Sequence, residues 1–152
     1  MENKEYLAVL AGCEKKYDSL YRGAAAAFGL SDCSMWVLYY LQSAEEPLSQ
    51  QDLIGLMLFP KQTINSAVSG LAKKGYVTLE MIPNTKNRKR ILLTDSGRAF
   101  AKKTVLRMIQ AEERAVSEMS DIERFVALYA EFFAYLHDEF EREGLWRTEC
   151  SI

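Results

Sequence analysis

The most distinctive side chains in this sequence lie on one face of a segment at residues 60–75, PKQTINSAVSGLAKKG. At about 100° per residue in a helix, one side of the segment is apolar and the other is polar. The apolar side consists of Ile64, Val68, Leu71 and Ala72, and the polar side of Gln62, Asn65, Ser66, Ser69 and Lys73. Amides, hydroxyls and ammonium groups form hydrogen bonds, which suits recognition better than catalysis. Because an ordinary solvated helix face would mix Glu with Lys, we expect this face to lie against a polar, negatively charged partner.

The charge of the surrounding region supports the same interpretation. Between Leu53 and Thr94 the chain has seven basic residues and one acidic residue, Glu80, for a formal charge of +6. The whole chain is −2, so the remainder is −8. A basic region within an acidic protein favours contact with phosphate groups. A solvated charge cluster without a partner is the alternative reading.

Residues that carry catalytic or metal chemistry are scarce. The chain has one histidine, His137, and no HExxH, GxGxxG, Walker or GxSxG motif. Its three cysteines, Cys13, Cys33 and Cys150, are far apart and lack CxxC spacing, which argues against a disulfide framework and a zinc site. We therefore predict no catalytic residue, no metal and no cofactor, and we interpret His137 as structural. An enzyme with its site among the aromatic helices is an alternative, although no pair of nucleophile and base is evident.

Length and composition set the class of protein. A chain of 152 residues fits one compact domain, or a small domain with long added helices. Its apolar share of 49% and charged share of 26% are typical of a soluble globular protein. No apolar run is long enough to span a membrane, and MENKEYLAVLAGCEKK at the start lacks the features of a secretory signal. We expect a cytoplasmic protein without membrane contact.

The elements before the polar segment are predicted to be helices. Apolar residues alternate at spacings of four and three over about 4–28, which indicates a helix with a narrow apolar stripe that ends at Gly29. Ser31 or Asp32 suits the cap of a second helix that runs to about residue 41. Ser49 and Asp52 form a capping-box pattern at the start of a short third helix. A short helix, a tight connection and a helix at 60–75 follow in the order of a helix-turn-helix.

The elements after Gly75 are predicted to be a hairpin and two long helices. Apolar and β-branched runs at 76–82 and 90–93 flank the basic turn PNTKNRK, which indicates a two-stranded hairpin with a positively charged tip. Thr94 suits the cap of a helix that continues to about Met119, and Asp121 begins another with a long apolar stripe. Because these stripes exceed what one small domain needs, we expect the termini to pack across a symmetric dimer. A bundle within one chain is the alternative.

From Leu48 through Gly97 the sequence resembles the winged-helix domain of MarR-family transcriptional regulators. The closest matches are LSQQDL, the helix ending in LAKKGYV, and LLTDSG after the second strand. The flanking helices also match in order and length, so the resemblance covers nearly the whole chain. It implies a single domain over residues 1–152 that is mainly α with a small β-hairpin wing. A winged helix-turn-helix lobe at about 31–97 would lie between helical dimerisation regions at about 1–30 and 98–152.

The resemblance also implies the function and its residues. Such a protein would be a transcriptional regulator, more often a repressor, that binds a pseudo-palindromic DNA operator as a homodimer. Groove and phosphate contacts would fall to Lys61, Gln62, Thr63, Asn65, Ser66 and Ser69, and phosphate contacts to Lys73, Lys86, Arg88, Lys89 and Arg90. The sequence departs from the family in the wing, where Thr85 and Asn87 occupy the places of a usual Asp-x-Arg pair. Arg88 or Arg90 is a candidate substitute, and we expect a looser wing tip.

Control of such a regulator has two candidate sites. A small aromatic or phenolic ligand could bind in a cleft lined by Tyr17, Tyr21, Trp36, Tyr39 and Tyr40. The alternative is that these residues are ordinary core, because aromatic residues at helical spacing usually pack. Redox sensing through Cys13 or Cys33 is a further alternative, although Cys13 falls on the apolar stripe, where cysteines are typically inert. A winged-helix module that binds proteins instead of DNA is the remaining reading, but the polar face offers no apolar anchor.

Overall fold

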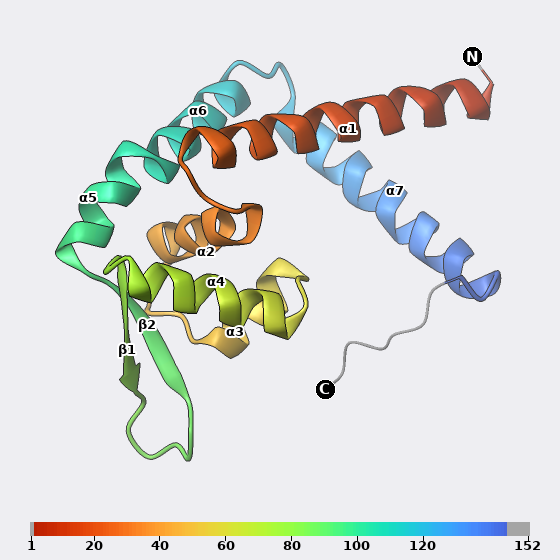
Figure 1. Ribbon diagram of the computed structural model, residues 1–152. Coiled ribbons are helices and arrows are strands. Elements are labelled where there is room, and N and C mark those ends of the chain that lie inside the picture. The colour runs from red at the N-terminus through yellow and green to blue at the C-terminus, as the bar shows by residue number, and fades with distance from the viewer. Residues whose placement is uncertain (1, 146–152) are drawn as a thin grey trace. The chain divides into compact units, whose positions relative to one another are not determined.

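The computed structural model describes residues 2–145 and contains seven helices and two strands in that range (Figure 1). The elements are α1 Asn3–Ala27, α2 Asp32–Ser43, α3 Gln50–Met57, α4 Lys61–Lys73, β1 Val77–Met81, β2 Lys89–Leu93, α5 Asp95–Lys103, α6 Val105–Ser117 and α7 Ile122–Arg142. The predicted fold class, mainly α with a small hairpin, is confirmed. By its internal contacts the chain divides into two compact units after Ala111.

Polar caps begin four of these helices at the residues that the sequence indicates. The hydroxyl of Ser31 accepts from Ser34 N at 3.2 Å at the start of α2. The hydroxyl of Thr94 accepts from Gly97 N at 2.9 Å, and the carboxylate of Asp121 accepts from Arg124 N at 3.0 Å. Ser49 caps α3 in a full capping box with Asp52. Each cap satisfies an amide that has no partner within its own helix, so the helix boundaries are set locally.

The core of the first unit lies where α2, α3 and α4 meet (Figure 1). Helix α2 packs on α4, and the hairpin strands and α5 close the remaining sides. The largest fully buried side chains of this core are Met35, Val37, Leu38, Leu53, Ile64, Val68, Leu71, Ile91 and Val105. Because the apolar side of α4 is used for this packing, its polar side is left facing outward.

The two strands form an antiparallel hairpin that projects from the helices (Figure 1). The register pairs Val77 with Leu93 at the base and Met81 with Lys89 toward the tip. The segment before α3 joins this hairpin through its backbone. Ile91 N donates to Leu48 O at 2.8 Å, and Ser49 forms an isolated antiparallel β-bridge with Arg90. Two residues of extended backbone leave no periodic signal, so this pairing with β2 is not predictable from the sequence. The bridge fixes the start of α3 against the wing.

Two predicted boundaries require correction. The helix expected from Thr94 to about Met119 is broken at Thr104, which has φ −123° and ψ −95° and separates α5 from α6. The buried Thr104 hydroxyl donates to Phe100 O at 2.7 Å, a bond back to the preceding turn that bends helices. Pro60, predicted as the first helical residue, is instead the N-cap of α4, so the helix begins one residue later at Lys61, and the Pro60 carbonyl accepts from Thr63 N and Ile64 N.

Large apolar side chains stay exposed on α1 and α7. On α1 they include Tyr6, Leu7, Val9, Tyr17 and Leu20, and on α7 they include Phe125, Val126, Leu128, Tyr129, Phe133, Tyr135 and Phe140. Exposed apolar surface of this extent is typical of an interaction face. None of the helices in the described range is long and apolar enough to cross a membrane.

Candidate nucleic-acid interface

The outward face of α4 presents the side chains that its sequence predicts. Lys61, Gln62, Thr63, Ser66, Ser69 and Lys73 are exposed, and Asn65 is half-buried. No carboxylate lies on α4, whose amides and hydroxyls remain accessible along three turns. A helix N-terminus also favours an anion through its unpaired amide groups. This face is therefore suited to hydrogen-bonding with a negatively charged partner.

Three elements surround a concave site beside this face. The site has a volume of about 180 Å³ and lies where the first turn of α3, the first turns of α4 and the wing meet. Its lining residues are Ser49, Gln50, Gln51, Ile54, Lys61, Asn65, Asn87, Arg88 and Lys89. Of the residues predicted for DNA contact, the site brings together Lys61 and Asn65 of α4 with Arg88 and Lys89 of the wing, and the others do not line it. Gln50, Gln51 and Asn87 also line the site and are not among the residues predicted from the sequence, although the first two lie within the predicted capping box.

Asp52 forms the centre of a hydrogen-bond network at the start of α3. Its Oδ2 accepts from Ser49 N at 2.8 Å and from Ser49 Oγ at 2.7 Å, while Asp52 N donates to Ser49 Oγ at 3.2 Å. The Ser49 hydroxyl, the Ser49 amide and the nearby Arg88 charge lower the pKa of Asp52, because each stabilises the carboxylate. Asp52 therefore stays ionised and fixed in place.

The wing cations differ in how they are held. Arg90 Nε and Nη2 donate to Glu80 Oε2 at 3.2 and 2.9 Å, across the register that pairs these residues. Arg88 Nη2 lies 3.7 Å from Asp52 Oδ1. Lys86 and Lys89 are exposed along the same hairpin. Arg88 and Lys89 thus line one site with Lys61 and Asn65 of α4, and both arginines are paired with carboxylates.

Thr85 closes the turn of the wing. Its hydroxyl donates to Ile82 O at 2.7 Å, and Ile82 N donates to Arg88 O at 2.9 Å. Asn84 has φ +62°, a left-handed conformation that Asn tolerates better than most residues. These bonds hold the backbone of the turn, and the expected loosening of the tip stays a prediction.

The five aromatic residues predicted for an effector cleft form one cluster of rings in contact, in which Tyr21 and Trp36 are stacked and the other pairs are tilted or edge-on. The centroids of Tyr17 and Tyr21 are 4.5 Å apart, and those of Tyr21 and Trp36 are 4.9 Å apart. The ring centroids of Trp36 and Tyr39 are 5.1 Å apart, and the ring of Tyr40 lies beside both of them. Helix α1 supplies two of these rings and α2 supplies three. None of the five lines the concave site beside α4 or the two cavities that Cys33 and Arg98 border.

The cysteines lie in different surroundings. Cys13 is exposed on α1, although its place on the apolar stripe suggests burial. Cys33 is buried, with 4% of its surface exposed, and burial raises the pKa of its thiol. It borders a cavity of about 380 Å³ between the start of α2 and Phe59, Thr63 and Ser66. Cys150 lies outside the described residues.

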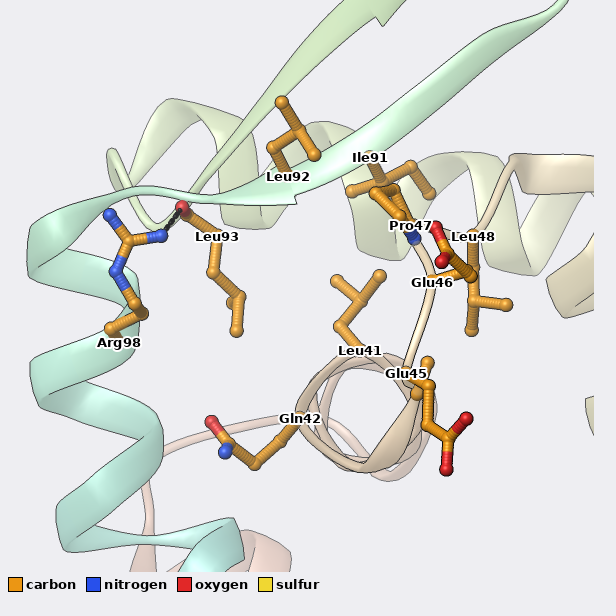
Figure 2. Close-up of a pocket in the computed structure, with 11 residues that line it drawn as sticks. Leu41, Gln42, Glu45, Glu46, Pro47, Leu48, Ile91, Leu92, Leu93 and Arg98 are labelled. Carbon is orange, nitrogen blue, oxygen red and sulfur yellow. Dashed lines mark hydrogen bonds between the residues drawn. The ribbon is translucent and has the colours of Figure 1, made fainter.

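A further cavity, of about 240 Å³, lies between the end of α2, the loop to α3, β2 and the start of α5 (Figure 2). Leu41, Leu48, Ile91 and Leu93 give it apolar walls, and Glu45, Glu46 and Arg98 lie around it. Arg98 is held at its edge, because Nη1 donates to Leu93 O at 2.6 Å and Nη2 to Asp95. It contains none of the residues predicted for DNA or ligand contact.

The match to known proteins agrees with this geometry. Residues 28–86, which contain α2, the helix-turn-helix and β1, match the family model described as the MarR family. Over these residues the winged-helix lobe is similar to the MarR family. The resemblance to that family is thereby confirmed for this lobe. No curated protein sequence matches the chain significantly.

Solved structures extend the MarR-type likeness to the fold of most of the chain. A MepR–DNA complex from S. aureus is 20% identical, covers 90% of this chain and 99% of its own, and has a TM-score of 0.65. A MarR family regulator from Neisseria meningitidis is 19% identical, covers 91% of this chain and 96% of its own, and has a TM-score of 0.72. A third structure is that of BpsR from Bordetella bronchiseptica, described with regulation of its DNA binding by 6-hydroxynicotinic acid. It is 16% identical, covers 84% of this chain and 91% of its own, and has a TM-score of 0.62.

Proposed function

We propose that this MarR-type protein binds double-stranded DNA sequence-specifically as a homodimer and represses transcription. The observation that carries the proposal is the grouping of the carboxylate-free face of α4 with wing cations around one concave site. Such a surface offers hydrogen bonds to base edges and positive charge to phosphates. The MepR structure determined as a DNA complex has a similar fold, which supports DNA binding by this chain. No catalytic step is part of this function.

The residue types divide the contacts between bases and phosphates. Asn and Gln can bind an adenine edge through two hydrogen bonds, which assigns base reading to Gln62 and Asn65. Lys61, Lys73, Lys86 and Lys89 would hold phosphates, together with the hydroxyls of the α4 face. Phosphate contacts set the position and affinity, whereas base contacts set the preferred sequence.

A homodimer is supported by the apolar residues that α1 and α7 expose. Water contact with this many leucine, phenylalanine and tyrosine side chains is unfavourable by about 25 cal/mol per Å² of apolar area. A second copy of the chain would cover them and place two α4 helices on half-sites about 34 Å apart. A pseudo-palindromic operator follows from that two-fold symmetry.

Selection from random duplex DNA tests this function. We expect the purified protein to enrich an inverted repeat at physiological salt. In anisotropy titrations with the enriched duplex, Asn65→Ala should weaken binding by about 1–3 kcal/mol because a base contact is lost. Gln110→Ala, which removes an exposed amide on α6, is the matched control and should bind like the wild type. Recovery of no motif, with weak and steeply salt-dependent binding, would contradict sequence reading and favour a protein-binding module.

We also propose that a small aromatic ligand releases the DNA, a function favoured by the cluster around Trp36. BpsR, of similar fold, is described with regulation of its DNA binding by 6-hydroxynicotinic acid, which is a hydroxylated aromatic acid. A ligand switches the protein only if it binds the free and DNA-bound states with different affinity. Calorimetric titration of both states with hydroxylated aromatic acids checks this, and equal affinities would exclude the coupling. The burial of Cys33 disfavours oxidation there as the switch.

A further inference from the structure

The tip of the wing is a cation-rich segment without a carboxylate of its own. Residues 83–89 read PNTKNRK, with three basic and no acidic side chains. Arg88 nevertheless lies next to an anion, because Asp52 of α3 approaches its guanidinium at 3.7 Å. The two residues are far apart in sequence and belong to different elements. The pair therefore connects the first turn of the helix-turn-helix to the wing.

Asp52 is held rigidly enough to act as an anchor. One carboxylate oxygen, Oδ2, is occupied by the amide and hydroxyl of Ser49. The other, Oδ1, faces Arg88. Ser49 itself bridges to Arg90 of β2, and Leu48 O accepts from Ile91 N. The backbone around the anchor is thus fixed to the same wing that carries Arg88.

Arg88 keeps most of its hydrogen-bonding capacity in this arrangement. A guanidinium group has five N–H donors, and a single contact through Nη2 leaves the others accessible. The Arg88 side chain is 56% exposed and lines the concave site together with Lys61 and Asn65. A phosphate at this site would meet donors from both the wing and α4.

We infer that Asp52 is a positioning residue that holds Arg88 over the concave site so that its guanidinium binds a DNA phosphate. This role rests on the proposed DNA binding and adds a contact between α3 and the wing to it. Two explanations predict opposite effects of removing the Asp52 charge on DNA affinity. A carboxylate near DNA repels phosphates, so by electrostatics alone its removal should tighten binding. If Asp52 positions Arg88, its removal should weaken binding, because the Arg88 side chain is no longer oriented toward the phosphate.

A double-mutant cycle with Asp52→Asn and Arg88→Gln tests the inference. The amide oxygen of Asn can still accept from Ser49 N, so the cap of α3 is largely retained, and thermal unfolding checks this separately. Using the selected duplex, we expect Asp52→Asn to weaken binding about twofold to fivefold, the range that an exposed ion pair provides. In the Arg88→Gln background the same change should have no weakening effect. Arg88→Gln should also reduce the salt slope by about one phosphate contact.

Glu80→Gln is the matched control, because it removes the carboxylate that pairs with Arg90 on the same hairpin. Its effect should be equal with and without Arg88. The positioning role is overturned if Asp52→Asn tightens binding, leaves it unchanged, or weakens it equally in both backgrounds. Failure of the wild type to bind any selected duplex would be a different result, since it would overturn the proposed function and this role together.

Discussion

Gly97 lies so close to the carbonyl group of Tyr76 that a Cβ atom at position 97 would stand 1.9 Å from Tyr76 O. The contact belongs to a junction in which the Thr94 hydroxyl donates to Gly75 O at 2.6 Å and Thr94 N donates to Tyr76 O at 3.0 Å. The end of α4, the start of β1 and the first turn of α5 meet there. The junction therefore sets how the wing leaves α4.

Substitution of Gly97 by Ala should destabilise the protein. The added methyl group would collide with backbone rather than with a movable side chain, so the first turn of α5 must shift. We expect a loss of about 1–3 kcal/mol in the free energy of unfolding, measured by urea denaturation. Gly55→Ala is the control, because nothing lies within 4 Å of its added Cβ in α3. That change should raise stability by about 0.5–1 kcal/mol, and equal effects at both sites would contradict the steric argument.

Asp52 should make stability depend on pH in the acid range. Its pKa in the folded protein is lowered from the ordinary value of 3.8, chiefly by Ser49. The carboxylate therefore stabilises the fold above that value, and the stabilisation is lost as the pH falls through the lower, folded-state pKa. We expect the melting temperature of the wild type to exceed that of Asp52→Asn near neutral pH and to converge on it in acid.

Ser49→Ala provides the complementary variant for this titration, since it removes the largest cause of the lowered pKa. Its acid transition should begin at higher pH than that of the wild type. A difference between wild type and Asp52→Asn that stays constant from neutral pH to pH 2 would contradict the assignment.

The apolar face of α7 should control the oligomeric state. Phe125 and Phe133 are 49% and 45% exposed, and burying a phenylalanine side chain is worth about 1.5–3 kcal/mol. We expect the Phe125→Glu/Phe133→Glu double variant to be a folded monomer in sedimentation equilibrium, with at least about a hundredfold weaker self-association. Glu131→Gln, a change of an exposed polar residue on the same helix, should leave the dimer intact. Persistence of the dimer in the double variant would place the interface elsewhere.

The thiol of Cys33 should be inert in the folded protein. Burial raises its pKa and limits access, so both the thiolate fraction and the reaction rate fall. We expect N-ethylmaleimide to modify Cys33 at least about a hundredfold more slowly in buffer than in 8 M urea, measured by peptide mass spectrometry, because reaction requires local opening. Rapid modification in buffer would revive the redox alternative at this residue.

Local sequence signals predicted most of the secondary structure because they act over three or four residues. Ser31, Ser49, Thr94 and Asp121 each cap a helix with their own side chain and the amide three positions on. Gly29 and Gly75 end helices in left-handed conformations, with φ +67° and +75°. The split at Thr104 escaped prediction because a threonine in a helix can either continue it or bend it, and the buried Ala101 and Val105 on either side give no periodic sign of the break.

The candidate DNA-binding surface could be predicted only in part. Residue types and helical spacing were enough to nominate the polar face of α4 and the basic wing, since both follow from short stretches of sequence. The roles of Gln50, Gln51 and Asn87 depend on the meeting of three elements and had no separate signal. The arrangement of the aromatic cluster also depends on tertiary packing: its five residues were nominated as a possible cleft, and their rings contact one another in the fold.

By itself the sequence determined the order of the helices, their caps and the hydrogen-bonding character of α4, because these depend on periodicity and near-neighbour bonds. Both carboxylates and both arginines are evident in the sequence. Only the tertiary structure decided that Asp52 pairs with Arg88 and Glu80 with Arg90. The physical reason is that an ion pair between distant residues requires the backbone to bring them within about 4 Å. That distance is set by core packing and by the bridge of Leu48 and Ser49 to β2.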